Sequence, residues 1–412
     1  MGKKIWLINQ YAMPPHLESR LRTIKYAYFL ANKGYEVTVF ASSVMHNMNI
    51  NLIKDGIPYL KKSYGKINFV HINTVQYGNS YIKRVLASIQ FHKRFIKFSA
   101  KFGKPDVIVQ VALVPFGNCI AKYAKKIKAR YIVEVLDLWP MSLIDVGMVT
   151  EKNLFLPILF RLERKQYESA DEIVFSMEGG MDYIRHKKWD IEQGGRIDIK
   201  HVHYINNGVD LSDFDNYKAN YQLEDNELDD VTLKKVIYIG SIRKANNLMS
   251  LIRAAELLKK QKNLIFLVYG DGDERPVLEA YCREHNLINV IFKQKWIDPC
   301  NVPYVLSCAY LNLLNYKTGF GSYGGSQSKL FQYMASAKPI CCNINMPYDP
   351  IKKYNIGISK EFISPDEYAD AIMKIINLPS EEYKAMCVRA RIAASDYDYR
   401  KLTRKLERLF LR

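Results

Sequence analysis

Short apolar segments alternate with helix-like patterns along the N-terminal half of the chain. KIWLIN begins at Lys4 and VTVFAS begins at Val37, and both have the length and composition of strands. Between them, residues 17–33 repeat apolar side chains every three or four positions, which predicts an amphipathic helix that Gly34 ends. Three more segments rich in β-branched residues each adjoin a helical stretch: DVIVQV, RYIVEVL and EIVFSM. This alternation predicts a parallel sheet with helices on both faces.

The same pattern starts again in the C-terminal half. Five more apolar segments follow, with helical stretches between them: KKVIYIGS, NLIFLVYGDG, NVIFK, YLNLLN and KPICCNI. The passage before them, 205–232, is polar and acidic without an apolar period, which is typical of a linker. A chain of 412 residues is also too long for one ordinary core. We therefore expect two doubly wound α/β domains, at 1–204 and 233–390, and a C-terminal helix in 391–412 that packs back on the N-terminal domain.

The loops that follow the strands are where ligand-binding residues are expected. Open parallel sheets bind ligands beyond the carboxyl ends of their strands, and two such domains facing each other form a cleft lined by these loops. In GSIRKANN, Gly240 ends a strand and is followed by Arg243 and Lys244. The planar guanidinium of an arginine suits a phosphate, because it donates two parallel hydrogen bonds. Solvated charges at the start of a helix remain the alternative for both residues.

A glycine- and serine-rich loop runs directly onto a helix at 319–340, GFGSYGGSQSKLFQYMASAKPI. The start of a helix binds anions, because it presents unpaired N–H groups and the positive end of the dipole. Gly324 and Gly325 let the backbone approach a ligand closely. Lys329 lies in the first turn, where the dipole disfavours a cation and a bound phosphate would explain it. The candidate phosphate-binding residues of this loop are these two glycines, Lys329, Ser326, Gln327 and Ser328.

Two carboxylates follow a strand of the first domain. Glu134 and Asp137 lie near the end of RYIVEVL and in the DLWPMS loop, on the side where the cleft is expected. Carboxylates there can orient a hydroxyl group or accept its proton. Structural hydrogen bonds to the loop backbone are the alternative, and they fit Glu134 better than Asp137.

The positive charge of the chain is concentrated in its first third. The net charge is +18, and residues 1–130 carry 22 Lys and Arg against four acids, a surplus that equals the charge of the whole chain. Residues 81–104 hold seven of these cations with aromatic side chains among them and no acid. A basic, aromatic helix suits an anionic membrane surface. An amphipathic helix packed on the sheet is the simpler interpretation, but it does not explain the missing acids.

Several features exclude other classes of protein. The seven cysteines include no Cys-x-x-Cys pair, and the eight histidines show no ligand spacing, so we expect neither disulfides nor a metal site. No run of about 18 apolar residues predicts a transmembrane helix. The first residues contain neither a signal peptide nor a myristoylation motif. These features predict a cytoplasmic protein, and no recognition motif suggests that it binds nucleic acid.

The chain resembles family 4 glycosyltransferases of the GT-B architecture. Within that family it is most similar to the branch that builds bacterial O-antigen and capsule, which includes enzymes like N-acetyl-fucosaminyl transferase. The matching segments occur in the family's order along nearly the whole chain: NQYAMPP, LANKGYEVTVFASS, DLWPMSLIDVG, RLERKQYESADEIVFSMEGGMDYI, INNGVDLSDF, GSIRKANNL, YGDGDER and SKLFQYMASAKPI.

Two family features are missing. The first loop reads PPHLESRL where family members usually have glycines that contact the donor phosphates. Many members also have two glutamates eight positions apart, and Gly324 and Gln332 occupy these positions here. Gln332 can still form hydrogen bonds with ribose hydroxyls, whereas the contact of the first glutamate with the sugar is lost or made by backbone N–H groups.

The resemblance implies a retaining transfer of a hexosyl or N-acetylhexosaminyl group from a nucleotide sugar, a UDP-sugar by preference, without a metal ion. It implies no cofactor, since the nucleotide sugar is a substrate. Arg243, Lys244, Lys329 and the helix start at Ser326 would stabilise the departing diphosphate. Gly240, Gly324, Gly325, Gln327, Ser328 and Gln332 would line the donor pocket, and Arg22 would close over the donor with the 11–22 loop. Asp137 would orient the acceptor, with Glu134 as a second candidate on that side.

The resemblance, together with the surplus of positive charge in the N-terminal domain, implies that the acceptor is a lipid-linked saccharide. The enzyme would work in surface polysaccharide biosynthesis, peripherally on the inner face of the plasma membrane, with residues 81–104 on the anionic lipid. Two alternatives remain open. The first is a GT-B-fold sugar-nucleotide epimerase, which would form its product without an acceptor. The second is a glycosyltransferase-like chain whose catalysis has decayed and which serves as a scaffold. The presence of Gly324 and Gln332 in place of the two glutamates is the reason to consider this second alternative.

Overall fold

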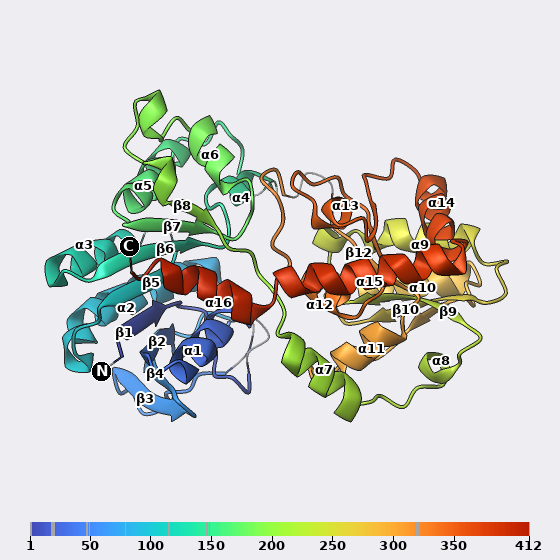
Figure 1. Cartoon of the computed structure of the whole chain (residues 1–412), viewed down its shortest axis with the longest axis horizontal. Helices are drawn as coiled ribbons and strands as arrows, with labels where there is room; N and C mark the ends of the chain where they lie inside the picture. Colours follow the sequence, from blue (N-terminus) through green and yellow to red (C-terminus); the bar gives the residue numbers. More distant parts are fainter. Residues whose placement is uncertain are drawn as a thin grey trace. The chain divides into compact units, whose positions relative to one another are not determined.

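The computed structural model divides the chain into two compact units (Figure 1). Unit 1 comprises Met1–Asn206 and Tyr399–Arg412, and unit 2 comprises Asn207–Asp398. The structure describes residues 2–17, 21–46, 48, 50–78, 80–113, 116–145, 147, 149–317 and 321–411. Each unit contains a single sheet flanked by helices, and each is described by itself below.

Unit 1 is built on an eight-stranded sheet in the order β3-β4-β2-β1-β5-β6-β7-β8. All neighbouring strands are parallel except β3 and β4, which form an antiparallel pair at one edge. The strands are β1 (Lys4–Ile8), β2 (Glu36–Ser42), β3 (Tyr59–Tyr64), β4 (Ile67–Ile72), β5 (Val107–Val111), β6 (Arg130–Val135), β7 (Glu172–Phe175) and β8 (Val202–Tyr204).

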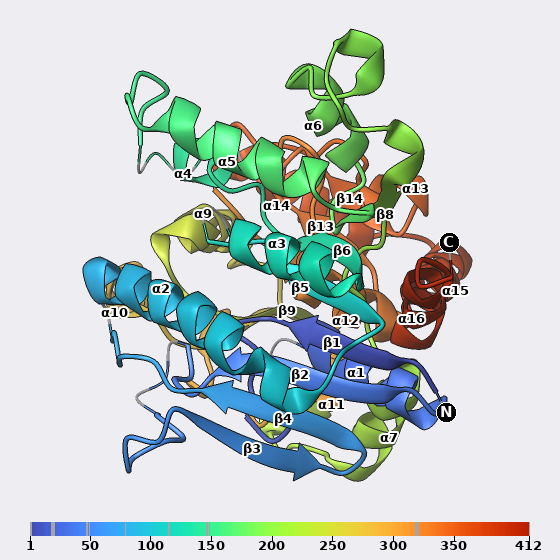
Figure 2. The ribbon, with the colours of Figure 1, turned by 90° about the vertical axis from the view of Figure 1, so that its left-hand side faces the viewer.

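Helices cover both faces of this sheet. The helices are α1 (Arg22–Asn32), α2 (Tyr81–Phe98), α3 (Asn118–Ile127), α4 (Met141–Asp145), α5 (Leu156–Glu168), α6 (Gly180–His186) and α16 (Tyr399–Arg408). Successive side chains of a strand point to opposite faces. On β1, Ile5 belongs to the core cluster shared with α1 and α16, whereas the Trp6 ring lies 6.0 Å from Phe95 of α2 and 6.3 Å from Tyr123 of α3. Figure 2 shows α2, α3 and α5 lying side by side on this second face.

Unit 2 is built on a six-stranded parallel sheet in the order β11-β10-β9-β12-β13-β14. Its strands are β9 (Lys234–Ile239), β10 (Leu264–Tyr269), β11 (Val290–Phe292), β12 (Leu311–Leu314), β13 (Ile340–Cys342) and β14 (Gly357–Ser359). Its helices are α7 (Leu211–Asn220), α8 (Asn226–Asp229), α9 (Leu248–Leu257), α10 (Arg275–Glu284), α11 (Val302–Cys308), α12 (Ser328–Ala335), α13 (Pro350–Lys353), α14 (Pro365–Ile376) and α15 (Ser380–Asp396). Its core continues on both faces, with α9 and α14 on one and α8 and α11 on the other.

The prediction of two doubly wound parallel-sheet domains is confirmed. Four strands escaped prediction: β3 and β4, which form a hairpin, and the short strands β8 and β14. The helix predicted over 17–33 begins at Arg22, and residues 18–20 of its predicted first turn lie outside the described residues. The passage predicted as a linker, 205–232, contains α7 and α8, and it belongs to unit 2 from Asn207 onward. Phe214 and Leu228 are the buried side chains that attach these two helices to unit 2.

The C-terminal helix α16 contributes core side chains to unit 1. Leu406 is fully buried in the cluster formed by α1, β1 and β2. We expect Leu406→Ala to lower the free energy of unfolding by about 2–5 kcal/mol, because the lost side chain leaves a cavity. Urea unfolding followed by tryptophan fluorescence reports mainly on unit 1, which holds Trp6, Trp139 and Trp189. The exposed neighbour Lys405, changed to Ala, is the control, and equal midpoints for the two variants would contradict this prediction.

Candidate functional site

In unit 2 the loops after β9 and β10 lie in direct backbone contact. Gly240 donates its N–H to the carbonyl of Tyr269 at 3.0 Å. A Cβ atom on Gly270 would overlap the Gly240 carbonyl, and one on Gly272 would overlap the Ile242 carbonyl. Because only glycine fits at 270 and 272, the YGDGDER turn serves the packing of the two loops.

Arg275 fixes this turn through hydrogen bonds to backbone carbonyls. Its guanidinium is buried and donates hydrogen bonds to the carbonyl of Gly270, to the carbonyl of Lys293 at 2.8 Å and to the carboxylate of Glu279 at 2.6 Å. Its donors are therefore committed to the protein, and Arg275 is a positioning residue. Glu279 lies four residues further along α10, but the two carbonyl partners follow the ends of β10 and β11, and the sequence gave no signal of them.

Lys329 lies against Gly240 at the end of β9. A Cβ atom on Gly240 would overlap the Lys329 amine, so the missing side chain is what makes room for the cation. The Lys329 Nζ is 3.3 Å from the hydroxyl of Tyr238 and 4.8 Å from the centre of its ring. Among the described residues no carboxylate pairs with this lysine. Burial lowers the pKa of Lys329 to about 8, so at neutral pH the site holds a cation without a counter-ion.

The start of α12, beside Lys329, has no side-chain cap. Gln327 occupies the N-cap position, but its side chain accepts no hydrogen bond from the first turn. Its amide packs toward Met346, and its Oε1 atom is buried without a partner among the described residues. Gly325 leaves the space that this amide fills, and Gly324 has a left-handed φ of +93°. The first N–H groups of α12 therefore keep the capacity to bind an anion, and the phosphate site predicted here stays a prediction.

Ser326 is held in place by the residue that opens unit 2. The Asn207 side chain donates to the Ser326 carbonyl at 2.6 Å, and the Asn207 backbone N–H donates to the Ser326 hydroxyl oxygen at 3.3 Å. The hydroxyl proton of Ser326 can still be donated to a ligand. Asn207 is thus a positioning residue of the loop. The two residues are 119 positions apart, so the sequence did not reveal this contact.

The remaining candidates of unit 2 differ in exposure. Ser328 and Gln332 are one helical turn apart on α12, and Gln332 is three residues from Lys329, so these side chains share one side of the helix. The Arg243 and Lys244 side chains are exposed and form no ion pair within the described residues. Their predicted role at a phosphate stays a prediction. Gly319 and Phe320, at the start of the predicted loop, lie outside the described residues.

Arg22 and Glu134 have structural partners in unit 1, which differs from their predicted roles. The Arg22 Nε donates to Glu134 Oε1 at 2.8 Å, and the two residues are only 4% and 2% exposed. The same guanidinium also donates to the carbonyls of Ile205 and Asn206. With these donors used and the group buried, Arg22 links α1, β6 and the end of β8. Arg22 is predicted to close over a donor and Glu134 to contact an acceptor. In the structure both side chains are buried and already hydrogen-bonded within unit 1.

Asp137 has the accessible carboxylate of this loop. Its side chain is exposed and accepts one hydrogen bond from the Ser142 hydroxyl at 3.2 Å. The surrounding chain still removes enough water to raise its pKa above the usual value. The pKa of Asp145 is raised as well, first by its own loss of water and then by the charge of Asp137. An exposed carboxylate of this kind has the capacity to accept a hydrogen bond from a ligand hydroxyl, and the role predicted for Asp137 at the acceptor stays a prediction. In the described part of the chain, no group of three or more His, Cys, Asp or Glu is arranged to hold a metal ion.

Comparisons with known proteins agree with this architecture. Residues 222–392 match the family model described as glycosyl transferases group 1, which covers most of unit 2. A search of curated proteins gave no significant match.

Solved structures resemble the chain along nearly its whole length. Sucrose-phosphate synthase from Thermosynechococcus elongatus has a TM-score of 0.71 at 15% identity, over 99% of this chain and 98% of that one. The trehalose-6-phosphate structure from E. coli bound with UDP-2-fluoro glucose scores 0.73 at 10% identity, over 99% of both chains. WaaG, a glycosyltransferase involved in lipopolysaccharide biosynthesis, scores 0.64 at 15% identity, over 98% of both chains. The chain therefore has the two-domain GT-B fold, with a region matching glycosyl transferases group 1 in its second unit.

Proposed function

We propose that the protein is a retaining glycosyltransferase that moves a sugar from a nucleotide sugar, preferably a UDP-sugar, to a saccharide acceptor. The observation that carries this proposal is Lys329, a partly buried cation without a counter-ion among the described residues, at the uncapped start of α12 and inside the region that matches the family. The match to a structure that was solved with UDP-2-fluoro glucose supports a UDP-sugar as donor.

The proposed reaction exchanges one bond of the sugar's anomeric carbon for another. The bond to the diphosphate oxygen breaks, and a bond to the acceptor hydroxyl oxygen forms on the same face. The proton of that hydroxyl passes to the departing phosphate. Lys329, Arg243, Lys244 and the N–H groups at the start of α12 stabilise the charge that develops on the diphosphate, because they are in place before the reaction begins.

The other candidates are assigned to binding. The backbone at Gly240, Gly324 and Gly325 and the side chains of Ser326, Gln327 and Ser328 contact the diphosphate and the sugar, and Gln332 contacts the ribose. In unit 1, Asp137 orients the acceptor hydroxyl. Arg22 and Glu134 are left out of the reaction because each neutralises the other.

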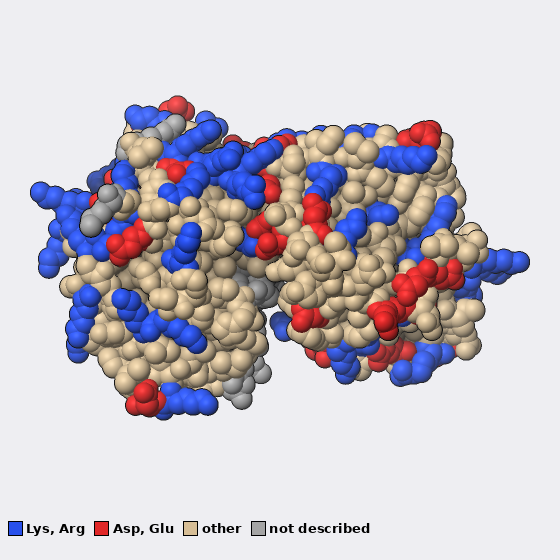
Figure 3. All heavy atoms as spheres, turned by 60° about the horizontal axis from the view of Figure 1, so that its bottom comes forward, with Lys and Arg blue, Asp and Glu red and all other residues tan. Residues whose placement is uncertain are grey.

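The proposed acceptor is a lipid-linked saccharide of surface polysaccharide biosynthesis, O-antigen or capsule, at the inner face of the plasma membrane. Support comes from α2, which buries one side and exposes Tyr81, Ile82 and Leu86 beside Lys83, with Ile82 73% exposed. A second apolar group follows at the start of α5, where Leu154, Phe155 and Ile158 are exposed and Leu154 is 88% exposed. On the face drawn in Figure 3, Lys and Arg outnumber acids over unit 1.

Among the described residues, two of the seven cations in 81–104 donate hydrogen bonds to other residues, and Lys97 and Lys101 lie over the ring of Phe98. Arg84 donates to the hydroxyl of Tyr11, and Arg94 donates to the carbonyl of Asn73. Lys93 and Lys97 are exposed without an ion pair among the described residues, so they are suited to contact lipid headgroups. No helix in the described part of the chain is long and apolar enough to cross a bilayer. Peripheral contact with an anionic surface is the mode of membrane binding that we propose.

The donor site is tested by thermal shift with nucleotides and nucleotide sugars. A ligand present at about a hundred times its dissociation constant is expected to add roughly 2.7 kcal/mol of stability. We expect UDP and one UDP-sugar to raise the melting temperature, Arg243→Ala to abolish the shift, and the exposed Lys260→Ala to leave it unchanged. The absence of any nucleotide shift would favour the scaffold, and a sugar product formed without acceptor would favour the epimerase.

The partly buried charge of Lys329 makes the stability of the folded protein depend on pH. Between about pH 8 and the ordinary lysine pKa of 10.5, the unfolded chain binds one more proton than the folded chain, so stability rises with pH in this range. We expect Lys329→Met to stabilise the protein near pH 7 and to lose this advantage toward pH 10.5, measured by urea unfolding. Lys244→Met removes an exposed charge and is expected to change little.

The same lysine is expected to make UDP binding depend on pH. A bound diphosphate favours the protonated amine of Lys329. The affinity for UDP is therefore highest below pH 8, the approximate pKa of Lys329 in the protein without ligand, and it falls as the pH rises through this value. Calorimetric titration should show weaker UDP binding above this pKa than below it, and at least tenfold weaker binding for Lys329→Met near neutral pH. Equal affinities of the wild type and Lys329→Met would remove Lys329 from the donor site.

The membrane contact is tested by flotation with vesicles that contain anionic lipid. Each lysine near an anionic surface contributes about 1 kcal/mol, so replacing Lys93 and Lys97 by Gln is expected to weaken partitioning roughly 30-fold. The same change at Lys260 and Lys262, two exposed lysines of unit 2, is the control with equal charge. Binding that is equal for neutral and anionic vesicles would rule out this surface.

A further inference from the structure

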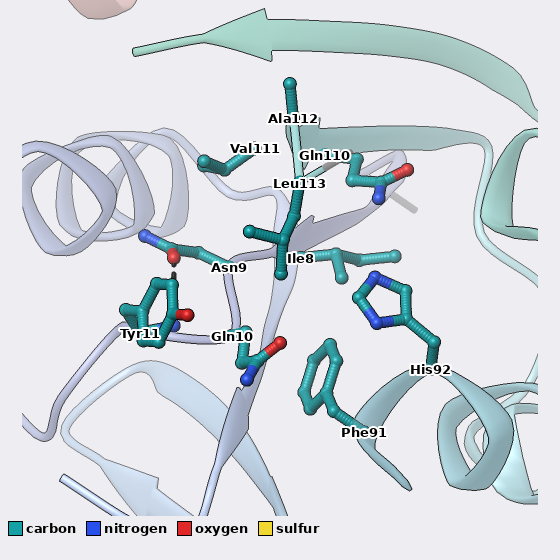
Figure 4. A pocket seen from close by; sticks show the side chains of 10 residues that line it. All are labelled: Ile8, Asn9, Gln10, Tyr11, Phe91, His92, Gln110, Val111, Ala112 and Leu113. Atoms are coloured by element: carbon teal, nitrogen blue, oxygen red, sulfur yellow. Dashed lines mark hydrogen bonds between the residues drawn. The ribbon is translucent and has the colours of Figure 1, made fainter. Parts of the chain in front are cut away.

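A small cavity opens at the carboxyl ends of β1 and β5, where α2 crosses them in unit 1 (Figure 4). Its volume is about 40 Å³. Ile8, Gln10, Phe91, His92 and Gln110 form its buried part, and Leu113 belongs to the partly exposed side. Carboxyl ends of parallel strands are where such sheets bind ligands. Of the segments predicted to bind donor or acceptor, only the 11–22 loop contributes to this lining, through Tyr11.

The cavity contains amide groups that the described residues leave unpaired. Gln10 is 5% exposed, and neither its Oε1 nor its Nε2 atom has a hydrogen-bond partner in the described part of the chain. Gln110 is 1% exposed; its Oε1 accepts from the Tyr131 hydroxyl at 2.7 Å, but its Nε2 also lacks a described partner. Buried polar groups are nearly always hydrogen-bonded. The two amide nitrogens, which are donors, and the Gln10 oxygen, which is an acceptor, can therefore form hydrogen bonds with a ligand.

His92 adds an acceptor to this set. Its Nδ1 lies 2.8 Å from the Ser88 carbonyl, which can only accept, so Nδ1 carries the proton and Nε2 keeps its lone pair. Burial lowers the pKa of His92 to about 4, which keeps the ring neutral. In Figure 4 the His92 ring and the Gln10 amide reach toward the cavity from opposite sides, with Phe91 between them.

The composition of the lining selects the kind of ligand. None of the residues that line the cavity carries a charge at neutral pH, so a phosphate or carboxylate would be buried without a counter-charge. The volume of about 40 Å³ admits a small group, such as one substituent of a sugar. The substituent must accept two hydrogen bonds, donate one and present an apolar part to Ile8, Phe91 and Leu113. An acetamido group does this, because its carbonyl has two lone pairs, its N–H is a donor and its methyl group is apolar.

We propose that this cavity, the amide pocket, binds the N-acetyl substituent of an acceptor sugar. Gln10 and Gln110 donate to the acetamido carbonyl, and the methyl group packs on Phe91. The N–H of a trans amide points away from its carbonyl, so His92 Nε2, on the side opposite Gln10, accepts from it. The Gln10 Oε1 atom accepts from a neighbouring hydroxyl of the same sugar. The assignment rests on the proposed function only in naming a saccharide as the acceptor. It adds that this saccharide ends in an N-acetylated sugar.

The test compares methyl glycosides that differ only in the acetamido group. Binding of methyl N-acetyl-glucosaminide and methyl glucoside, and of the corresponding galactose pair, is measured by protein-observed NMR titration of the whole chain, with and without UDP. We expect at least one N-acetylated member to bind ten times or more tighter than its partner. Gln10→Met, which keeps the length of the side chain but loses its hydrogen bonds, is expected to remove this preference. The exposed Gln261→Met is the control.

Each outcome bears on one of the two proposals. Equal binding of both members of each pair by the wild type would overturn the amide pocket, and this measurement does not depend on the folding of any variant. A Gln10→Met protein with a changed melting temperature but an unchanged preference would also overturn it, since ordered water alone would then fill the cavity. Failure of UDP to shift the melt, with the N-acetyl preference intact, would contradict the donor site and leave the amide pocket standing.

Discussion

The contact between Gly240 and Lys329 is the constraint on which the candidate site of unit 2 depends. Glycine at the end of β9 leaves space for the lysine amine, and the ring and hydroxyl of Tyr238 hold the amine there. No described carboxylate neutralises this cation, and the adjacent start of α12 is uncapped. The protein thus keeps a positive charge in a partly buried place at a cost in stability, and an anionic ligand is what would offset that cost.

In unit 1 the buried cation Arg22, unlike Lys329, has a carboxylate as its counter-ion. Arg22 is paired with Glu134, and its other donors close the end of β8 through the carbonyls of Ile205 and Asn206. Breaking such a pair would leave an uncompensated buried charge, so the pair is needed for the fold even if its net contribution is small. The presence or absence of a counter-ion therefore separates the structural arginine of this chain from its candidate ligand-binding lysine.

The two units also present different chemistry at the carboxyl ends of their strands. In unit 2 the groups are cations and helix N–H donors, which suit phosphate. In unit 1 the pocket residues Gln10, His92 and Gln110 are neutral, and they match a ligand group that both donates and accepts hydrogen bonds. This division agrees with a donor that carries a diphosphate and an acceptor group without charge.

The sequence by itself determined the two series of strands and helices and the place of Lys329 in a first helical turn, because periodicity and turn chemistry are local properties. It did not reveal β3, whose YLKKSY has exposed lysines at the sheet edge and no apolar alternation. Tertiary structure alone decided the partners of side chains. Glu134 lies 112 residues from Arg22 and became its counter-ion, and Gln10, His92 and Gln110 meet although about eighty residues or more separate Gln10 from the others. Such meetings depend on which strands become neighbours in the sheet, and no local pattern records that order.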